Sequence, residues 1–364
     1  MKCELSSICT YRKGKTKVAE LNPTTYISTE NMLPNKGGII ASSGLPNSLT
    51  TQEFQTGDVL VSNIRPYFKK IWLAEYCGGC SNDVLVFTAN KEIDPTFLYY
   101  VLADDTFFSY ATATAKGTKM PRGDRTAIMQ YLVPQYDLPT QKKIGAILRS
   151  LDDKIELNNK INENLERQVY ALFESWFMSF DKNEEIVPND WYRGTLGEIA
   201  SITSGKRPPM KQSFSTAEIK IPLVGASSVM GYTNAVLYNE PILVTGRVGT
   251  HGIVQRFRTP CWASDNTLVI KSDFYEYTYQ VLLRVDYTNM NRGSTQPLIT
   301  QTDLKNAPIV VPPKSVMLKF EQIAGTLMAK HQANHEENKR LSGLRDTLLP
   351  KLMSGEIDVE DVKI

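Results

Sequence analysis

Apolar residues recur along one stretch of the chain at alternating spacings of four and three. The stretch begins after Pro139, where Thr140 is a suitable N-cap, and continues to about Phe180. This repeat, kept for more than four heptads, is typical of the seam of a coiled coil. The predicted seam comprises Ile144, Leu148, Leu151, Ile155, Asn158, Asn162, Leu165 and Val169, and the spacing continues through Leu172 and Trp176. At 1.5 Å per residue the helix is expected to be roughly 55 Å long, and it needs a partner helix to cover its apolar stripe.

The same spacing recurs near the C-terminus, where Ile323 lies 179 residues after Ile144. The second predicted seam comprises Ile323, Leu327, Asn334, Leu341, Leu344 and Leu348, with Lys330 and Glu337 in its middle. Both seams are apolar at the ends and polar in the middle, and polar seam positions fix register and partner. We therefore predict that the two helices pair with each other. The pattern itself is compatible with a parallel and with an antiparallel pair.

The segments that precede the two helices also resemble each other. The matching pairs are residues 4–8 and 198–202, 57–61 and 240–244, 81–86 and 264–269, and 117–121 and 293–297. Short runs rich in β-branched residues, bounded by Gly, Pro and Asn, predict strands at 59–64, 84–88, 242–245 and 267–270. Helices are expected at 95–102 and 275–284. These repeats indicate a tandem duplication.

The predicted fold class is therefore α+β. Two tandem mixed α/β domains, residues 1–139 and 181–314, alternate with two long helices in residues 140–180 and 315–364. The acidic run 181–185, followed by Pro188, is expected to link the first helix to the second domain.

Charge and composition narrow the class of protein. The 364 residues include 41 Lys and Arg against 39 Asp and Glu, a net charge of +2, so binding of nucleic acid through bulk positive charge is not expected. The sequence contains no run of 18 apolar residues and no apolar N-terminal signal segment. Its five cysteines do not suggest a disulfide framework. We expect a soluble, cytoplasmic protein that does not bind membranes.

Motifs that carry catalysis or metal binding are nearly absent. Gly14-Lys15-Thr16 lacks the upstream glycine and the strand of a phosphate-binding loop. Cys77 and Cys80 have zinc-ligand spacing, and only Cys3 and Cys9 could complete a set of four, so a Gly-Gly hairpin turn is favoured over zinc. His331 and His335 are expected on a solvated helix face. We predict neither catalytic nor metal-binding residues.

Basic and aromatic residues gather instead in glycine-rich loops of both domains. The candidate DNA contacts are Arg12, Lys15, Arg65, Tyr67, Lys69, Lys119 and Arg122 in the first domain, and Lys206, Arg207, Arg247, His251, Arg292 and Gln296 in the second. Such side chains can contact phosphates and base edges. Ordinary solvated loops are the alternative, and the recurrence of the loops in both copies favours a function.

Several segments resemble one known family. They are residues 138–144 leading to 151–155, residues 348–357 near the C-terminus, residues 196–199, and residues 57–61 followed by Asn63-Ile64-Arg65. With the duplicated architecture, they resemble the DNA-specificity subunits of type I restriction–modification enzymes. The start of the chain departs from the pattern, because residues 1–4 lack the Trp and Leu-Gly that precede the second copy.

The resemblance implies two target-recognition domains, each reading one half of a bipartite sequence in double-stranded DNA. It implies that the two helices pack antiparallel as a spacer and dock the modification subunits, of which two are expected. The subunit would have no catalysis and no cofactor of its own. S-adenosylmethionine would serve the modification subunits, and ATP and Mg²⁺ the restriction subunits. The alternative is a protein-interaction scaffold, spaced by a coiled coil, without DNA specificity.

Overall fold

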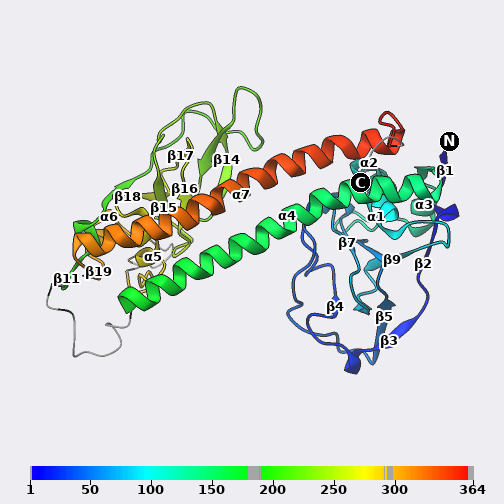
Figure 1. Ribbon diagram of the computed structural model, residues 1–364, viewed down its shortest axis with the longest axis horizontal. Helices are drawn as coiled ribbons and strands as arrows, with labels where there is room; N and C mark the ends of the chain where they lie inside the picture. Colours follow the sequence, from blue (N-terminus) through cyan, green and yellow to red (C-terminus); the bar gives the residue numbers. More distant parts are fainter. Residues whose placement is uncertain (1, 179–187, 189, 291, 293–297, 360–364) are drawn as a thin grey trace. The chain divides into compact units, whose positions relative to one another are not determined.

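A computed structural model describes residues 2–178, 188, 190–290, 292 and 298–359, and the chain divides into two compact units (Figure 1). Unit 1 comprises residues 1–158 and 336–364, and unit 2 comprises residues 159–335. Two long helices, α4 (Leu138–Phe173) and α7 (Lys314–Ser354), each contribute to both units. In the described part of the chain, no helix is both long and apolar enough to cross a membrane.

Unit 1 is built around a four-stranded sheet of order β2-β9-β6-β7. A second sheet has the order β3-β5-β8-β4, and β1 pairs with β10. The strands are β1 (Lys2–Glu4), β2 (Cys9–Tyr11), β3 (Lys15–Lys17), β4 (Tyr26–Ile27), β5 (Thr50–Phe54), β6 (Val59–Ser62), β7 (Ile71–Leu73), β8 (Gly78–Cys80), β9 (Val84–Ala89) and β10 (Leu132–Pro134). The helices are α1 (Pro95–Ala103), α2 (Asp105–Ala113), α3 (Arg125–Met129) and the 3₁₀ turns η1 (Leu5–Ser7), η2 (Val18–Glu20) and η3 (Pro66–Phe68).

The central strands of unit 1 are buried on both faces, which explains their uninterrupted apolar sequence. Successive side chains of a strand point to opposite faces, so Val59 and Val61 join the core that also contains α1, whereas Leu60 joins a second core with Phe54. Asp94 caps α1, because its carboxylate accepts the Phe97 backbone N–H at 2.9 Å.

Unit 2 repeats this plan. Its four-stranded sheet has the order β12-β18-β15-β16, which corresponds strand by strand to β2-β9-β6-β7, and β11 pairs with β19 as β1 pairs with β10. The strands are β11 (Tyr192–Thr195), β12 (Ser201–Ser204), β13 (Ile221–Val224), β14 (Val229–Thr233), β15 (Ile242–Gly246), β16 (Gln255–Phe257), β17 (Trp262–Ala263), β18 (Thr267–Lys271) and β19 (Pro308–Val311). The helices are α5 (Tyr275–Leu282), α6 (Gln301–Lys305), the π-helical segment η4 (Glu174–Met178) and the 3₁₀ turn η5 (Leu196–Glu198). The second sheet is shorter here, with the order β14-β13-β17. The predicted α+β class with two tandem mixed domains is confirmed.

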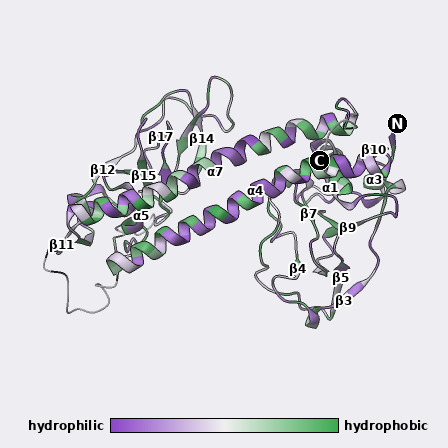
Figure 2. Cartoon of the chain, viewed as in Figure 1, coloured by the Kyte–Doolittle hydropathy of each residue, from purple (hydrophilic) through white to green (hydrophobic). Residues whose placement is uncertain are grey.

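The two long helices are amphipathic: apolar positions alternate with polar ones along both (Figure 2). In unit 1 they pair antiparallel, because Arg345 of α7 binds Asp152 of α4 at 2.7 Å while the earlier residue Asn338 accepts a hydrogen bond from the later residue Asn158 at 2.9 Å. At the start of α4 the Asp137 carboxylate accepts the Thr140 backbone N–H at 3.0 Å, so the cap is Asp137 and not Thr140.

Unit 2 contains the other half of each helix, again antiparallel. Asn334 donates to the Asn162 side-chain oxygen at 2.9 Å, and His331 Nε2 lies 3.1 Å from Glu166 Oε1. The polar middles of the seams therefore meet within each unit, as the antiparallel arrangement requires. A buried polar pair costs stability but restricts the register that two helices can adopt.

The predicted seam matches α4 closely and α7 only in part. On α4, Ile144, Leu148, Leu165 and Val169 are at most 8% exposed. On α7, Ile323 is 44% and Leu344 is 48% exposed, so their assignment to the seam was wrong. The buried residues of α7 include Phe320, Ala324, Met328, Leu349 and Leu352. Part of α7 is thus rotated relative to the expected register, because Phe320 packs against Phe173 and Phe177, with ring centroids 5.8 and 5.3 Å away.

Glu321 of α7 caps the N-terminus of α5 in unit 2. Its carboxylate accepts the backbone N–H of Glu276 at 2.9 Å and that of Tyr277 at 3.4 Å. Although these hydrogen bonds favour the charged form, burial raises the pKa of Glu321 to about 6 from its ordinary value of 4.5.

We predict that this carboxyl group makes unit 2 less stable as the pH rises from about 4.5 to 6.5. The folded protein binds the proton more tightly than the unfolded chain, so stability is present below the unfolded pKa and lost as the pH rises through the folded pKa. Allowing for partial exposure, the loss should be about 1–2 kcal/mol. Urea unfolding of the wild type and Glu321→Gln across this pH range measures it. A difference between the two proteins that does not change with pH would contradict the assignment.

Candidate nucleic-acid interface

Three loop segments of unit 1, distant in sequence, meet at one end of the β6-β9 pair. The Arg65 N–H donates to the Pro121 carbonyl at 2.8 Å, and the Gly123 N–H donates to the Asn63 carbonyl at 3.1 Å. Asn63 in turn donates its N–H to the Asp83 carbonyl at 2.8 Å. The three segments, residues 63–70, 82–84 and 116–125, are called the unit 1 loop cluster below.

The unit 1 loop cluster contains five of the seven candidate DNA contacts of the first domain: Arg65, Tyr67, Lys69, Lys119 and Arg122. Tyr67 is 49% exposed, and Lys119 and Arg122 are also exposed. The Arg122 guanidinium binds Asp83 at 3.0 Å. In so exposed a pair the ion pair adds little stability, so a phosphate could replace the carboxylate at small cost.

The structure does not bring Arg12 and Lys15 to this cluster. Arg12 forms two hydrogen bonds with Asp58, whose side chain is almost fully buried, and the second of them is 2.9 Å long. Asp58 also accepts the Thr88 hydroxyl at 2.8 Å and the Gln55 N–H at 2.7 Å. Lys15 lies in β3, in the second sheet. Arg12 is therefore a structural residue that neutralises a buried carboxylate.

The candidate contacts of unit 2 gather at the corresponding end of its sheet. Lys206 and Arg207 follow β12, and the Gly205 N–H donates to the Thr267 carbonyl at 3.1 Å. The Arg247 N–H donates to the Asn266 carbonyl at 2.8 Å, so both loops leave the sheet at the same turn. Lys206 and Arg207 are exposed, and Arg247 is half-buried.

Arg292 joins the same region through the backbone. The Ile299 N–H donates to the Arg247 carbonyl at 2.9 Å, and the Arg292 N–H donates to the Leu298 carbonyl at 3.1 Å. The Arg292 side chain forms an ion pair with Asp303. His251 Nδ1 lies 3.3 Å from the Gly246 carbonyl oxygen, so this ring nitrogen faces the sheet. Gln296 lies outside the described residues.

Two basic residues near the unit 1 loop cluster were not among the candidates. Lys116 binds Asp124 and, through its backbone, pairs with Arg122 in both directions at 2.8 and 2.9 Å. Lys36 binds Asp105 at 2.9 Å, beside Lys69. Lys116 starts a basic run that the sequence does show, whereas no pattern in the sequence connects Lys36 with Lys69.

The Cys77–Cys80 segment is not the hairpin turn that the sequence favoured. Gly78, Gly79 and Cys80 form β8, where a Cβ on Gly78 would lie 2.2 Å from the Thr25 carbonyl oxygen, so the glycines allow neighbouring strands to approach. Cys80 is buried, and burial raises the pKa of its thiol to about 12. Within the described residues, His, Cys, Asp and Glu side chains form no group of three that could hold a metal ion.

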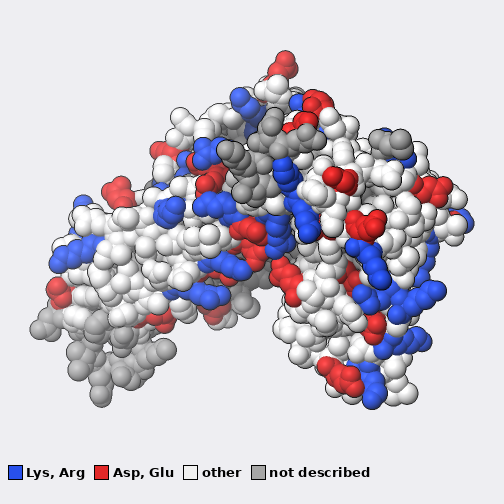
Figure 3. All heavy atoms as spheres, turned by 45° about the vertical axis from the view of Figure 1, so that its right-hand side comes forward, with Lys and Arg blue, Asp and Glu red and all other residues white. Residues whose placement is uncertain are grey.

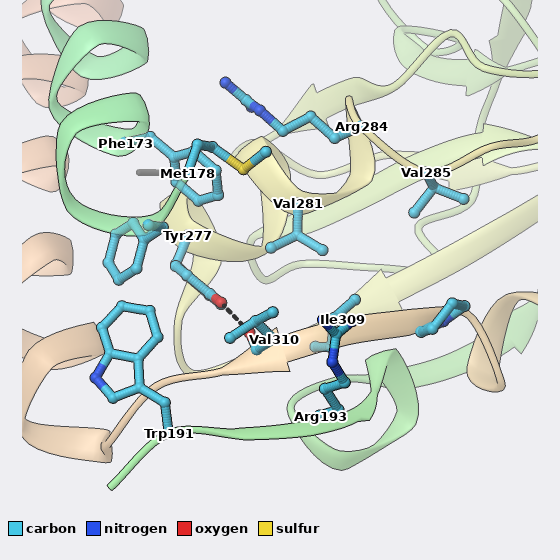
Figure 4. Close-up of a pocket in the computed structure, with 12 residues that line it drawn as sticks. Phe173, Met178, Trp191, Arg193, Tyr277, Val281, Arg284, Val285, Ile309 and Val310 are labelled. Atoms are coloured by element: carbon cyan, nitrogen blue, oxygen red, sulfur yellow. Dashed lines mark hydrogen bonds between the residues drawn. The ribbon is translucent and has the colours of Figure 1, made fainter. Parts of the chain in front are cut away.

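A cavity of about 320 Å³ lies in unit 2 beside the end of α4 (Figure 4). Phe173, Trp191, Tyr277 and Val281 point into it, and the Tyr277 hydroxyl donates to the Val310 carbonyl at 2.9 Å. Arg284 at its edge is bound to Glu174 at 2.7 Å. None of the candidate DNA contacts is among the described residues that line it, so the cavity belongs to the packing of the end of α4 within unit 2.

The part of the surface that Figure 3 shows carries charges of both signs. On the face drawn in Figure 3, Lys and Arg side chains are interspersed with Asp and Glu. The net charge of the chain is only +2, so the part of DNA affinity that comes from a broad positive field should be small.

Comparison with known proteins gives these clusters a context. The family model described as the type I restriction modification DNA specificity domain matches residues 1–167 and residues 188–340. The specificity subunit of the type I restriction enzyme MjaIX of Methanocaldococcus jannaschii is 26% identical, over 73% of this chain and 70% of its own length. The HindI specificity subunit of Haemophilus influenzae is 25% identical, over 91% of this chain and 94% of its own length.

The fold is also shared with a solved structure. The S subunit of a type I restriction–modification system from M. genitalium is similar with a TM-score of 0.61 at 19% identity, covering 97% of this chain and 96% of that chain. The match of the family model covers most of the sequence and falls on both repeats. The chain therefore belongs to the family of type I restriction–modification DNA specificity proteins.

Proposed function

We propose that this chain is the non-catalytic specificity subunit of a type I restriction–modification complex and that it reads a bipartite sequence in double-stranded DNA. Residues 1–139 and 181–314 would be the two target-recognition domains, each reading one half. The observation that carries the proposal is that both matches to the family's DNA specificity domain contain a cluster of basic loops at the same end of a sheet with the same strand order.

The contacts are assigned to the loop clusters. In unit 1 we propose Arg65, Tyr67, Lys69, Lys119 and Arg122, and in unit 2 Lys206, Arg207, Arg247, His251 and Arg292, with Gln296 as a further candidate. Arg12 and Lys15 are omitted because of their places in the fold. Because each domain has few cations, we expect the subunit alone to bind DNA weakly. Partner subunits would then make many of the contacts to the DNA phosphates.

The outer faces of residues 140–180 and 315–364 would dock the modification subunits, two per complex. This is supported by large apolar side chains that are 44% to 52% exposed on the two helices: Leu157, Tyr170, Leu318, Ile323 and Leu344. The paired helices would also set the gap between the half-sites.

The reactions are assigned to the partners. Modification subunits would transfer the methyl group of S-adenosylmethionine to adenine, and restriction subunits would use ATP and Mg²⁺. The complex would act in the cytoplasm. This chain would determine the DNA sequence at which the partner subunits act.

The test is to assemble the chain with its modification subunits, treat a library of DNA sequences, and map the methylated adenines. We expect one bipartite sequence, bound by the complex at least about 10³-fold more tightly than unrelated DNA, and weak binding by the chain alone. A complex that forms but methylates and binds without sequence preference would identify the chain as a protein scaffold.

A further inference from the structure

Two loops of unit 1 hold their backbone in a conformation that side chains disfavour. The described non-glycine residues with positive φ are Asn35 (55°), Lys36 (61°), Arg65 (50°) and Lys69 (52°). The two loops are joined by hydrogen bonds, because the Asn35 N–H donates to the Phe68 carbonyl and the Lys36 N–H to the Lys69 carbonyl, both at 2.8 Å. Left-handed backbone costs free energy for any residue with a Cβ, and such strain persists mainly where function requires it.

The duplicate copy shows what an unstrained version of this loop contains. Arg65 is the third residue after Ser62, which pairs with Val84 at the end of β6. Gly249 is the third residue after Gly246, which pairs with Thr267 at the equivalent end of β15, and its φ is 84°. Unit 2 therefore has a glycine at the position of Arg65.

Lys69, the second cation with positive φ, also has a glycine as its counterpart in unit 2. Leu60 pairs with Trp72, which is the third residue after Lys69. The equivalent residue Val244 pairs with Gln255, which is the third residue after Gly252, whose φ is 80°. Glycine adopts this region without steric cost. Glycine would therefore fit at both positions without strain, but unit 1 has a long cationic side chain at each.

The side chains of this loop are held at the surface. Lys69 donates to the Asp105 carboxylate at 2.7 Å, and Lys36 binds the other oxygen of Asp105 at 2.9 Å. Between Arg65 and Lys69, Tyr67 and Phe68 are 49% and 39% exposed. Asp105 is itself 60% exposed, so it can yield Lys69 to a stronger anion.

Building on the proposed function, we propose that Arg65 and Lys69 bind phosphate groups of the DNA backbone, at two positions where unit 2 has glycine and makes no such side-chain contact. A cation kept at a strained position, where glycine would fit without strain, indicates that its charge has a function. Phosphate contacts fix the position of a protein on the duplex without reading its sequence. The two units therefore differ in their phosphate contacts at these two positions.

The test is the pair of substitutions Arg65→Gly and Lys69→Gly, singly and together, in the full complex with the modification subunits. Because unit 2 already has glycine at both positions, the variants should fold, with a melting temperature equal to or above that of the wild type. Affinity for a duplex carrying the wild-type methylation sequence should fall. The slope of log affinity against log salt should become shallower by about one for each residue, and the methylated sequence should not change.

Two controls accompany these variants. Arg65→Lys keeps the charge and should retain the wild-type salt slope, and Lys91→Gly removes an exposed lysine beyond the opposite end of β9 and should leave the slope unchanged. Wild-type affinity and slope in the double variant would overturn the inference. So would relaxed sequence preference at one base pair with an unchanged slope, which would make Arg65 a base-reading residue. Absence of any sequence preference in the wild-type complex would instead contradict the proposed function.

Discussion

Replacing residues 181–314 by the corresponding segment of another specificity subunit is expected to change one half of the methylated sequence and to leave the other half intact. The two copies of the recognition domain have their own sheets and their own loop clusters, so each should read DNA separately. Each mismatched base pair costs about 1–3 kcal/mol, and several mismatches in one half should abolish methylation of the original sequence. Mapping of modified adenines measures the outcome.

The design of this exchange follows from the packing of unit 2. Tyr277 packs against Phe173, Phe177 and Phe320, which lie outside the exchanged segment, so the donor segment should retain an aromatic residue at that position. The matched control is the reciprocal exchange of residues 1–139, which should change only the other half. A change in both halves after either single exchange would refute separate readout.

Glu276→Gln is expected to destabilise unit 2 by about 3 kcal/mol, because it removes one partner of a buried ion pair. The Glu276 side chain has no exposed surface, lies 3.1 Å from Arg256 and also binds Arg258. The neutral amide would remove the buried counter-charge of two guanidinium groups, which are themselves 19% and 32% exposed. Arg256 also lies 3.5 Å from the ring centre of Tyr279, so the loss should spread into the packing of α5.

Tryptophan fluorescence during urea unfolding is a suitable measurement, because three of the four tryptophans, Trp176, Trp191 and Trp262, are in unit 2. The control is Glu240→Gln, which breaks an ion pair with Lys271 whose side chains are 56% and 41% exposed. That variant should change the free energy of unfolding by less than about 1 kcal/mol. Equal effects of the two substitutions would show that Glu276 is not a buried counter-ion.

Elements with several apolar residues in a regular pattern were predictable from the sequence. Features that depend on residues far away in the chain were not. The apolar runs of β6, β9, β15 and β18 identify central strands because both faces of each strand are buried. The sheet β3-β5-β8-β4 was missed, because its strands have two to five residues and carry too few apolar positions to show a period. The register of α7 was misplaced in part because the aromatic contacts of Phe320 rotate that helix.

Some residues of the candidate site were likewise predictable from the sequence, and others were not. Basic residues in glycine-rich loops identified most of the two loop clusters. Arg12 was misjudged because its partner Asp58 is 46 residues away in the chain, and no local pattern connects them. The strain at Arg65 and Lys69 could not be predicted either, since residues with a Cβ normally avoid positive φ and only comparison with Gly249 and Gly252 makes it meaningful.

The division of the chain into units also has a consequence for the order in which the protein is made. Unit 2 is continuous, from residue 159 to residue 335, whereas unit 1 combines residues 1–158 with residues 336–364. On the ribosome, residues 1–158 emerge first but must wait for residues 336–364 before α4 acquires its partner in that unit. Unit 2 can therefore complete its fold before unit 1 does, although it is synthesised later, and the first half of α4 has no partner helix until residues 336–364 have been made.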